Sequence, residues 1–199
     1  MIIAVEGIDG AGKRTIVQAI QREYGARTLA FPRYEESIHA QLAQQALHGK
    51  MGDLTDSIYG MATMFALDRY GAKAQIAEYA ETGVLVLDRY VASNAAYSWA
   101  RSGEKAIVDW VADLEFSQLG LPVPDLQVLV DTPPAVAQER AVKRAVADAT
   151  RERDRYERDA SLQQATYEAY VALAEQGWAS RWLRTTDAGT IMQAVEAVR

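Results

Sequence analysis

The sequence contains no cysteine among its 199 residues. This absence excludes disulfide bonds, thiolate metal sites and cysteine nucleophiles, and it fits a reducing compartment. Long apolar runs are missing too, because no stretch approaches the roughly 18 residues that a membrane-spanning helix needs. No basic segment followed by an apolar one precedes the first strand-like residues, as a secretory leader would. We therefore expect a cytoplasmic protein without a membrane partner.

An excess of positive charge is also lacking. The chain carries 21 Lys and Arg against 27 Asp and Glu, which gives a formal net charge of −6 and a pI of about 5.0. Broad, nonspecific nucleic-acid binding needs an electropositive surface, so we expect no nucleic-acid partner. With 49% hydrophobic residues, the chain is long enough for one sizeable core. No repeat or linker interrupts it, which predicts a single domain over residues 1–199.

Short apolar segments alternate with longer helical patterns along the chain. Several of these segments are apolar nearly throughout, as strands buried on both faces of a parallel sheet require. We expect an α/β fold of three layers, with a five-stranded, mainly parallel sheet flanked by helices. The expected strands are Ile2–Glu6, Thr28–Phe31, Val84–Asp88, Leu126–Val130 and Trp182–Thr185. Helices are expected to begin at Lys13, near Ser37, near Leu54, near Glu104, at Pro134, near Asp159 and near Ala188.

Residues 54–81 keep a helical periodicity for more than 25 residues, and Gly83 follows. Gly60 and Gly71 weaken the prediction of one continuous helix. A helix of that length could pack against a second copy as well as against its own sheet. The length of this helical pattern therefore suggests the hypothesis of a homodimer.

The first strand runs into a glycine-rich loop with the pattern G-x-x-x-x-G-K, from Gly7 to Lys13. Glycines at 7, 10 and 12 let backbone N–H groups surround phosphate oxygens, and the following helix adds its positive N-terminal end. A plain glycine-rich turn before a helix is the alternative. The order of strand, loop, lysine and helix favours phosphate binding.

Arg14 stands where this loop normally has Ser or Thr, and the nearest hydroxyl is on Thr15. A guanidinium beside Lys13 can bridge phosphate oxygens and stabilise a phosphoryl group during its transfer. Alternatively, Arg14 points into solvent from the first turn. Without the hydroxyl ligand, Mg²⁺ would be held by carboxylates, water and substrate phosphates.

Asp88 and Arg89 follow another buried strand, at the carboxyl end where open α/β sheets bind ligands. The acid could orient Mg²⁺ through water, and the arginine could hold a phosphate. A simple salt bridge in a loop is the alternative. Because the phosphate-binding loop belongs to the same sheet, we expect the pair to be functional.

Two further groups could recognise a nucleotide base. Phe65 and Arg69 are four residues apart, so a ring and a guanidinium project from one helix face. Ser93, Asn94 and Tyr97 lie within about one helical turn after Arg89, and an asparagine amide can match a base edge that both donates and accepts. A core aromatic beside a surface arginine, and ordinary helix caps, are the alternatives.

Residues 143–158 are dense in charges of both signs. Such a pattern usually indicates a solvated surface with many ion pairs. A lid rich in arginine that closes over phosphates, and so excludes water, would have the same pattern.

Taken together, "EGIDGAGKRT", "FPRY", "FALDR", "LDRYVASNAAY" and "RDRYERD" resemble the motifs of the thymidylate kinases, and the resemblance extends to the C-terminal helix. It is strongest to actinobacterial members, which also have arginine after the loop lysine. The resemblance implies a P-loop nucleoside monophosphate kinase fold with a lid at about 143–158. It also implies transfer of a phosphoryl group from Mg-ATP to dTMP, which gives dTDP for dTTP synthesis.

The resemblance assigns site residues by position. It places ATP at Gly7, Asp9, Gly10, Ala11, Gly12, Lys13, Arg14 and Thr15. It places dTMP at Asp9, Phe31, Tyr34, Phe65, Arg69, Arg89, Ser93, Asn94, Tyr97, Asp154 and Tyr156. The implied catalytic residues are Lys13, Arg14, Asp88, Arg89 and Arg153, and the implied metal ligands are Asp9 and Glu157.

The resemblance also implies individual roles. Phe31, Tyr34 and Arg89 would frame the acceptor phosphate. Phe65 would stack on thymine, whose polar edge Arg69 and Asn94 would read. Tyr97 would crowd the 2′ position of the sugar, and Arg153 would approach the transferring phosphate.

Family members are homodimers and often have a cis bond before the motif proline, so Phe31–Pro32 is expected to be cis. Most members have Ser where Arg14 stands, which leaves open how the loop and lid arginines share the work. No general base is needed for this reaction, because a phosphate monoester is already a nucleophile, so positioning and charge neutralisation would supply catalysis. A kinase for another nucleoside monophosphate and a nucleotide-dependent switch are the alternatives.

Overall fold

The computed structural model describes residues 1–147 and 154–198. Five strands form the sheet: β1 (Ile2–Glu6), β2 (Arg27–Ala30), β3 (Leu85–Asp88), β4 (Leu126–Val130) and β5 (Trp182–Thr185). Helices of the first half are α1 (Lys13–Tyr24), α2 (Ile38–Leu47), α3 (Ile58–Gly71), α4 (Lys73–Glu81) and α5 (Val91–Ser102). Those of the second half are α6 (Ala106–Ala112), the π-helix η1 (Asp113–Gln118), α7 (Pro134–Ala147), α8 (Arg155–Arg158), α9 (Ala160–Glu175) and α10 (Ala188–Glu196).

The strands pair in the order β2-β3-β1-β4-β5, and all four pairings are parallel. β1 and β4 are buried along their whole length, which explains why their sequences do not alternate between apolar and polar residues. The expected α/β fold is confirmed, and the sheet is entirely rather than mainly parallel. Its central strand β1 leads directly into the glycine-rich loop.

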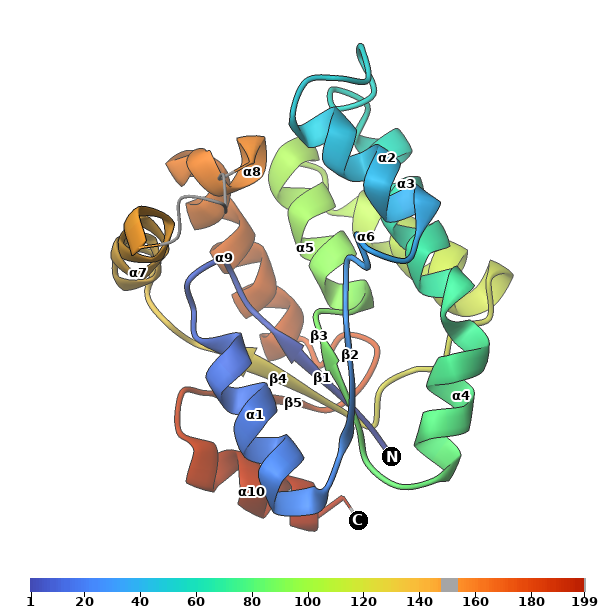
Figure 1. Ribbon diagram of the computed structural model, residues 1–199, viewed down its shortest axis with the longest axis vertical. Coiled ribbons are helices and arrows are strands. Elements are labelled where there is room, and N and C mark those ends of the chain that lie inside the picture. The colour runs from blue at the N-terminus through green and yellow to red at the C-terminus, as the bar shows by residue number, and fades with distance from the viewer. Residues whose placement is uncertain (148–153, 199) are drawn as a thin grey trace.

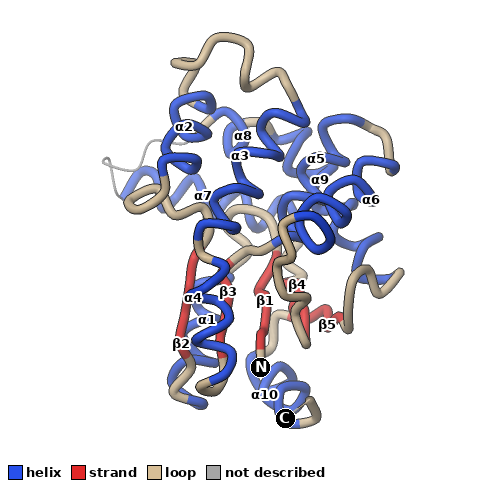
Figure 2. The backbone as a smooth tube through the Cα atoms, turned by 90° about the vertical axis from the view of Figure 1, so that its right-hand side faces the viewer, coloured by secondary structure: helices blue, strands red, loops and turns tan. Residues whose placement is uncertain are grey.

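Helices cover the sheet and also extend beyond its carboxyl edge. α1 packs on β1 and β3 beside α10, whereas α9 packs on β4 and β5 and makes its most extensive contact with α5. Figures 1 and 2 show α2, α3, α5 and α6 gathered beyond the ends of the strands, on the side opposite the chain termini. The carboxyl ends of the strands therefore face a helical region, and the candidate site lies between the two.

One sequence prediction was wrong in detail, because residues 54–81 do not form a single helix. Ser57 caps α3 by accepting a hydrogen bond from the Gly60 backbone N–H, and residues 54–56 before it form turns. Nη2 of Arg33 donates to the Asp68 carbonyl at 2.6 Å. The backbone N–H of Ala72, which a continuous helix would direct to that carbonyl, donates to the carbonyl of Arg69. The helix is thereby interrupted between α3 and α4.

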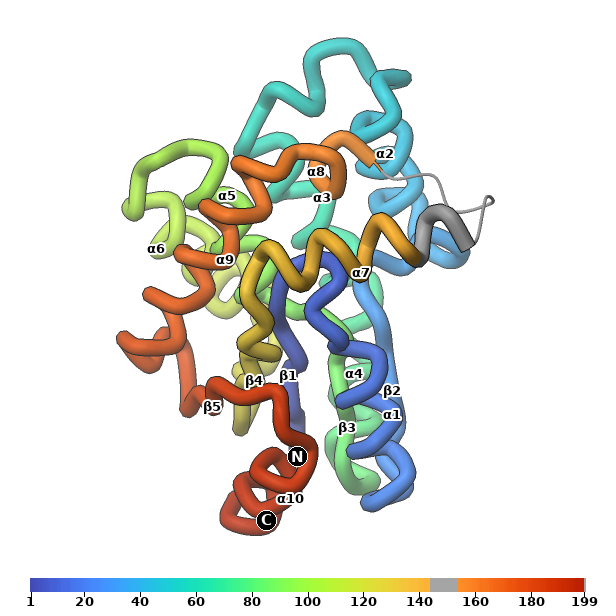
Figure 3. Tube along the Cα trace, turned by 90° about the vertical axis from the view of Figure 1, so that its left-hand side faces the viewer, coloured from blue at the N-terminus to red at the C-terminus, as the bar shows by residue number. Residues whose placement is uncertain are grey.

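The predicted lid segment, residues 143–158, is only partly described. α7 runs to Ala147, residues 148–153 lie outside the described residues, and α8 follows as one short turn that Asp154 caps at its N-terminus. Figure 3 shows α7 passing close to the loop between β1 and α1. Within the described ranges, no helix is both long and apolar enough to cross a membrane.

Candidate active site

A cavity of ≈ 420 Å³ opens at the carboxyl edge of the sheet. Its walls come from the glycine-rich loop, the ends of β2 and β3, α3, α5 and the start of α8. Most of the predicted site residues line it: Asp9, Gly10, Gly12, Lys13, Arg14, Phe31, Tyr34, Phe65, Arg69, Asp88, Arg89, Ser93, Asn94, Tyr97, Asp154, Tyr156 and Glu157. Gly7 and Ala11 of the loop and Thr15 of α1 do not line the cavity, and Arg153 lies outside the described residues.

The glycine-rich loop has backbone angles that explain its composition. Gly7, Gly10 and Gly12 have φ of 142°, 83° and 103°, which side chains disfavour. At Gly10 the backbone of α7 is also very close, since a Cβ would lie 2.0 Å from the carbonyl oxygen of Ala137. The loop is therefore packed against the first half of α7, the helix that leads into the predicted lid segment.

Lys13 is held across the same loop. Its Nζ donates to the carbonyls of Gly7 and Ile8 at 3.0 and 2.9 Å. Burial, helped by the positive charge of Arg89, lowers the pKa of Lys13 to about 8 despite the opposing effect of Asp9. Arg14, the next residue, is exposed and lines the cavity. Both cationic residues therefore lie at the loop end of the cavity.

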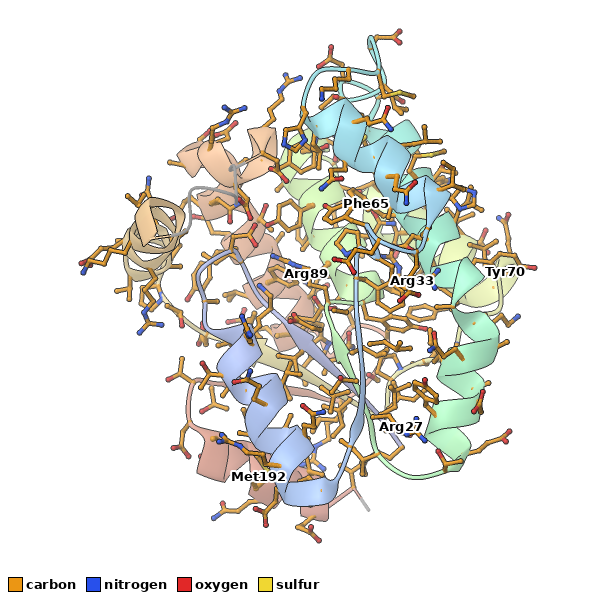
Figure 4. The ribbon with its side chains drawn as sticks, viewed as in Figure 1. Arg27, Arg33, Phe65, Tyr70, Arg89 and Met192 are labelled. Carbon is orange, nitrogen blue, oxygen red and sulfur yellow. The ribbon has the colours of Figure 1, made fainter. Side chains whose placement is uncertain are left out.

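Arg89 connects the loop to β3 and α5, and Figure 4 shows it near the centre of the molecule. Its Nη2 donates to Oδ1 of Asp9 at 2.6 Å, and Tyr97 donates to Oδ2 of the same carboxylate at 3.1 Å. Although burial opposes ionisation, Arg89 and Lys13 hold the pKa of Asp9 well below its usual range. Asp9 is thus a fixed anion beside two cations.

Arg89 also has φ of 67°, a left-handed conformation that costs a non-glycine residue roughly 1–2 kcal/mol. The fully buried carboxylate of Glu6 stabilises this turn by accepting from the backbone N–H of Tyr90 at 2.8 Å and from the Ser93 hydroxyl at 2.6 Å. Tyr170 donates to Glu6 as well. Burial raises the pKa of Glu6, and the hydrogen bond from Ser93 opposes that shift.

Arg69 and Asn94 line the same cavity together with Phe65, which Figure 4 labels. Both are almost fully buried, and both donate to Glu115 of the π-helix. Asn94 uses its other amide N–H to reach the carbonyl of Ala62 at 3.0 Å. An aromatic ring, a guanidinium and an amide therefore line one cavity, and Glu115 joins the last two.

Asp154, with Tyr156 and Glu157 of α8, lines a further side of the cavity. The rings of Tyr156 and Tyr97 are stacked with centroids 6.0 Å apart. Gln163 bridges three elements, because its Oε1 accepts from the Asp9 backbone N–H while its Nε2 donates to the Tyr156 carbonyl and the Tyr97 hydroxyl. Burial raises the pKa of Asp154 at the N-terminus of α8.

Asp9 and Glu157 also line a second, smaller cavity of ≈ 200 Å³ beside α7 and α9. Within the described part of the chain, no group of three or more His, Asp or Glu side chains could hold a metal ion. Asp9 and Glu157 line both cavities, and two carboxylates still suit Mg²⁺, which keeps several water ligands and takes phosphate oxygens from its substrate.

Sequence reasoning missed three residues that organise this site: Glu6, Glu115 and Gln163. Glu6 had a signal, because it is a charged residue at the end of an otherwise apolar strand. Glu115 stands in a mixed acidic and apolar segment, and nothing in that pattern indicates its buried role. The expected cis bond between Phe31 and Pro32 is confirmed.

A family model described as thymidylate kinase matches residues 5–195. The thymidylate kinase of Mycobacterium tuberculosis is 53% identical over 192 residues, which cover 92% of this chain and 90% of that protein. A probable thymidylate kinase of Archaeoglobus fulgidus is 32% identical over 148 residues, which cover 72% of this chain and 70% of that protein.

Two solved structures share the fold. The thymidylate kinase of Candida albicans superposes with a TM-score of 0.72 at 20% identity, over 98% of this chain and 91% of that one. A deoxyadenosine kinase from M. mycoides superposes with a TM-score of 0.69 at 17% identity over the full length of both chains. The chain therefore belongs to the thymidylate kinase family, and its activity is the ATP-dependent conversion of dTMP to dTDP.

Proposed function

We propose that the 420 Å³ cavity is the dTMP site and that the glycine-rich loop holds the phosphates of ATP. One observation carries the proposal: three cationic residues, Lys13, Arg14 and Arg89, line the same cavity as the aromatic ring of Phe65. A nucleoside monophosphate combines the matching features, a phosphate dianion and an aromatic base. We assign the phosphate to the three cations, the cationic end, and the base to the ring of Phe65, the base-binding end.

At the cationic end, Arg89 is proposed to bind the phosphate of dTMP together with Phe31 and Tyr34. Its position is well defined, because Asp9, Ser93 and the Gly7 carbonyl all accept hydrogen bonds from its guanidinium. A fixed guanidinium can align the acceptor phosphate for in-line attack, since little of its freedom is lost on binding.

At the base-binding end, thymine is proposed to stack on Phe65 while Arg69 and Asn94 bind its polar edge. Tyr97 is proposed to lie at the sugar, where its ring would exclude a 2′-hydroxyl. Asp154 and Tyr156 are proposed to close over the same sugar from α8, as parts of a lid within one domain over residues 1–199. Ser93 is proposed to line the dTMP site and also to help position Arg89, because its hydroxyl accepts from Arg89 and donates to Glu6.

The reaction is proposed to need no general base. The phosphate of dTMP attacks the γ-phosphorus of ATP, the bond from that phosphorus to the β,γ-bridging oxygen breaks, and ADP leaves with its electron pair. Gly7, Gly10, Ala11, Gly12 and Thr15 are the proposed loop contacts of the donor. Lys13 and Arg14 are proposed to neutralise the phosphates, and Asp88 to support the charge of Lys13.

Mg²⁺ is the proposed cofactor, with Asp9 and Glu157 as its protein ligands, directly or through water. Bound there with ATP, Mg²⁺ would neutralise charge on the phosphates. Arg89 keeps the Asp9 carboxylate ionised and oriented, which is the form that a hard cation requires. Arg153 is proposed as a lid contact of the transferring phosphate.

Arg14→Ala tests the loop arginine. If Arg14 acts on the transferring phosphoryl group, kcat falls by about 10²-fold or more, whereas the affinity for ATP falls much less. Arg22→Ala is the matched control, because Arg22 lies in the last turn of the same helix and is exposed. Unchanged turnover in Arg14→Ala, measured as dTDP formation, would assign the role to another residue.

A homodimer through the α3 side of the molecule is also proposed. Tyr59 and Tyr70 of α3 are about half exposed, at 52% and 48%, and Trp110 of α6 packs edge-on against Tyr59 at 4.7 Å. Figure 4 shows Tyr70 at the periphery of the molecule. Sedimentation at micromolar concentration should give a dimer that Tyr59→Asp weakens; a monomer mass for the wild-type chain would refute the proposal. The cytoplasm is the proposed location, as for the family.

A further inference from the structure

Glu115 is fully buried in the π-helix and does not line the cavity. Its carboxylate nevertheless contacts both residues proposed to read the base. Oε2 accepts from Nε of Arg69 at 2.5 Å, and Oε1 accepts from Nη2 of Arg69 at 2.7 Å and from Nδ2 of Asn94 at 2.8 Å. One side chain thus fixes two others.

The contact determines which way the Asn94 amide faces. One amide N–H donates to Glu115 and the other to the carbonyl of Ala62, so both donors are directed into the protein. Both partners are acceptors only, and a reversed amide would place its oxygen against them. The Oδ1 of Asn94 is left for the cavity, which Asn94 lines.

The same contact determines what Arg69 can offer. Glu115 takes Nε and one proton of Nη2, and within the described ranges the guanidinium of Arg69 makes no other hydrogen bond. Arginine has five N–H donors, so its remaining protons, on Nη1 and Nη2, are available to a ligand. The cavity therefore presents a donor from Arg69 and an acceptor from Asn94.

We infer that Glu115 is a positioning residue that sets the donor and acceptor polarity of the base site, and with it the choice between thymine and cytosine. Thymine has an acceptor at O4 and a donor at N3–H, which complement Arg69 and Asn94. Cytosine has a donor at N4 and an acceptor at N3, so both contacts would be mismatched. The inference rests on the proposed base site and extends it to a residue behind the cavity wall.

Glu115→Gln tests the inference, because the amide has nearly the same shape but carries donor protons, and so removes one of the two acceptors that hold Asn94 in one orientation. We expect the ratio of kcat/KM for dTMP over dCMP to fall by at least about tenfold. The ratio for dTMP over dUMP should stay within about twofold, because thymine and uracil share this polar edge. A site that had merely loosened would change both ratios or neither.

Asp113→Asn is the matched control, since it makes the same chemical change at an exposed position of the same π-helix. It should leave both ratios unchanged. An unchanged dTMP to dCMP ratio in Glu115→Gln would overturn the inference. Asn94→Ala distinguishes a failure of the inference about Glu115 from a failure of the proposed base site. If Asn94→Ala also leaves base selectivity unaltered, the proposed base site itself is wrong.

If Glu115→Gln fails to fold, the orientation of the Asn94 amide can still be tested in the wild-type chain. The two Nδ2 protons of Asn94 should exchange slowly with solvent before any nucleotide is added, measured by NMR on the assigned side-chain amide. Fast exchange of both protons in the nucleotide-free protein would refute the fixed orientation.

Discussion

Tyr97 is placed where its hydroxyl and its ring have separate functions. The hydroxyl donates to Asp9 at 3.1 Å and accepts from Gln163 at 3.3 Å, whereas the ring stacks on Tyr156 and lies beside Arg89. Tyr97→Phe removes the hydroxyl and keeps the ring. We therefore expect the variant to lose support for Asp9 while it retains the steric barrier at the sugar.

The expected loss of stability follows from the bond to the carboxylate. A hydrogen bond to a charged group contributes about 1.5–3 kcal/mol. The 3.1 Å distance is long for such a bond, and the Asp9 side chain is 21% exposed, so we expect the low end, about 1.5 kcal/mol. For a chain of 199 residues, this corresponds to a Tm lower by roughly 3–6 °C.

Thermal unfolding and competition assays measure the two effects separately. Tyr97→Phe should lower the Tm as stated and leave the preference for dTMP over its ribonucleotide counterpart within about twofold, whereas Tyr97→Ala should lose that preference. Tyr79→Phe is the control, because among the described residues its hydroxyl bonds only to the neutral amide of Gln75. Loss of the deoxyribose preference in Tyr97→Phe, or a Tm equal to that of the wild type, would refute this reasoning.

Two further predictions concern the glycine-rich loop. Gly10→Ala should abolish ATP binding and destabilise the fold by more than Gly25→Ala, because the added Cβ would collide with the Ala137 carbonyl. At Gly25 no described residue lies within 4 Å of such a Cβ, so only the roughly 1–2 kcal/mol cost of a left-handed residue applies. Equal losses of stability in urea denaturation would contradict the packing at Gly10. Because the pKa of Lys13 is lowered to about 8 and polyphosphate favours the charged amine, ATP affinity should fall as pH rises through about 8. Calorimetry in buffers of different ionisation enthalpy should detect proton uptake on binding near that pH, and Lys13→Arg should abolish it.

The sequence predicted the elements that depend on local patterns. β1, β4 and β5 were placed to the residue, and β1 and β4 are apolar at four of their five residues, as strands buried on both faces tend to be. The glycine-rich loop was recognisable, because its spacing is fixed by the backbone conformations that phosphate binding needs. Most of the residues assigned by family resemblance line one cavity.

Interactions between distant segments could not be predicted in the same way. The break between α3 and α4 depends on Arg33, which comes from a loop 35 residues before Asp68 in the chain and binds its carbonyl. Glu115 reaches Arg69 across 46 residues of sequence, and Gln163 reaches the backbone of Asp9 across 154. Nothing near these residues in the sequence indicates such contacts, since they depend on the tertiary fold.

A crystal structure of this chain with dTMP bound tests the proposed site most directly. Thymine should stack on Phe65, with its O4 facing Arg69 and its N3–H facing Oδ1 of Asn94. The phosphate should contact Arg89 at the other end of the cavity. A dTMP molecule in the reverse orientation, or bound outside this cavity, would contradict the assignment of both ends.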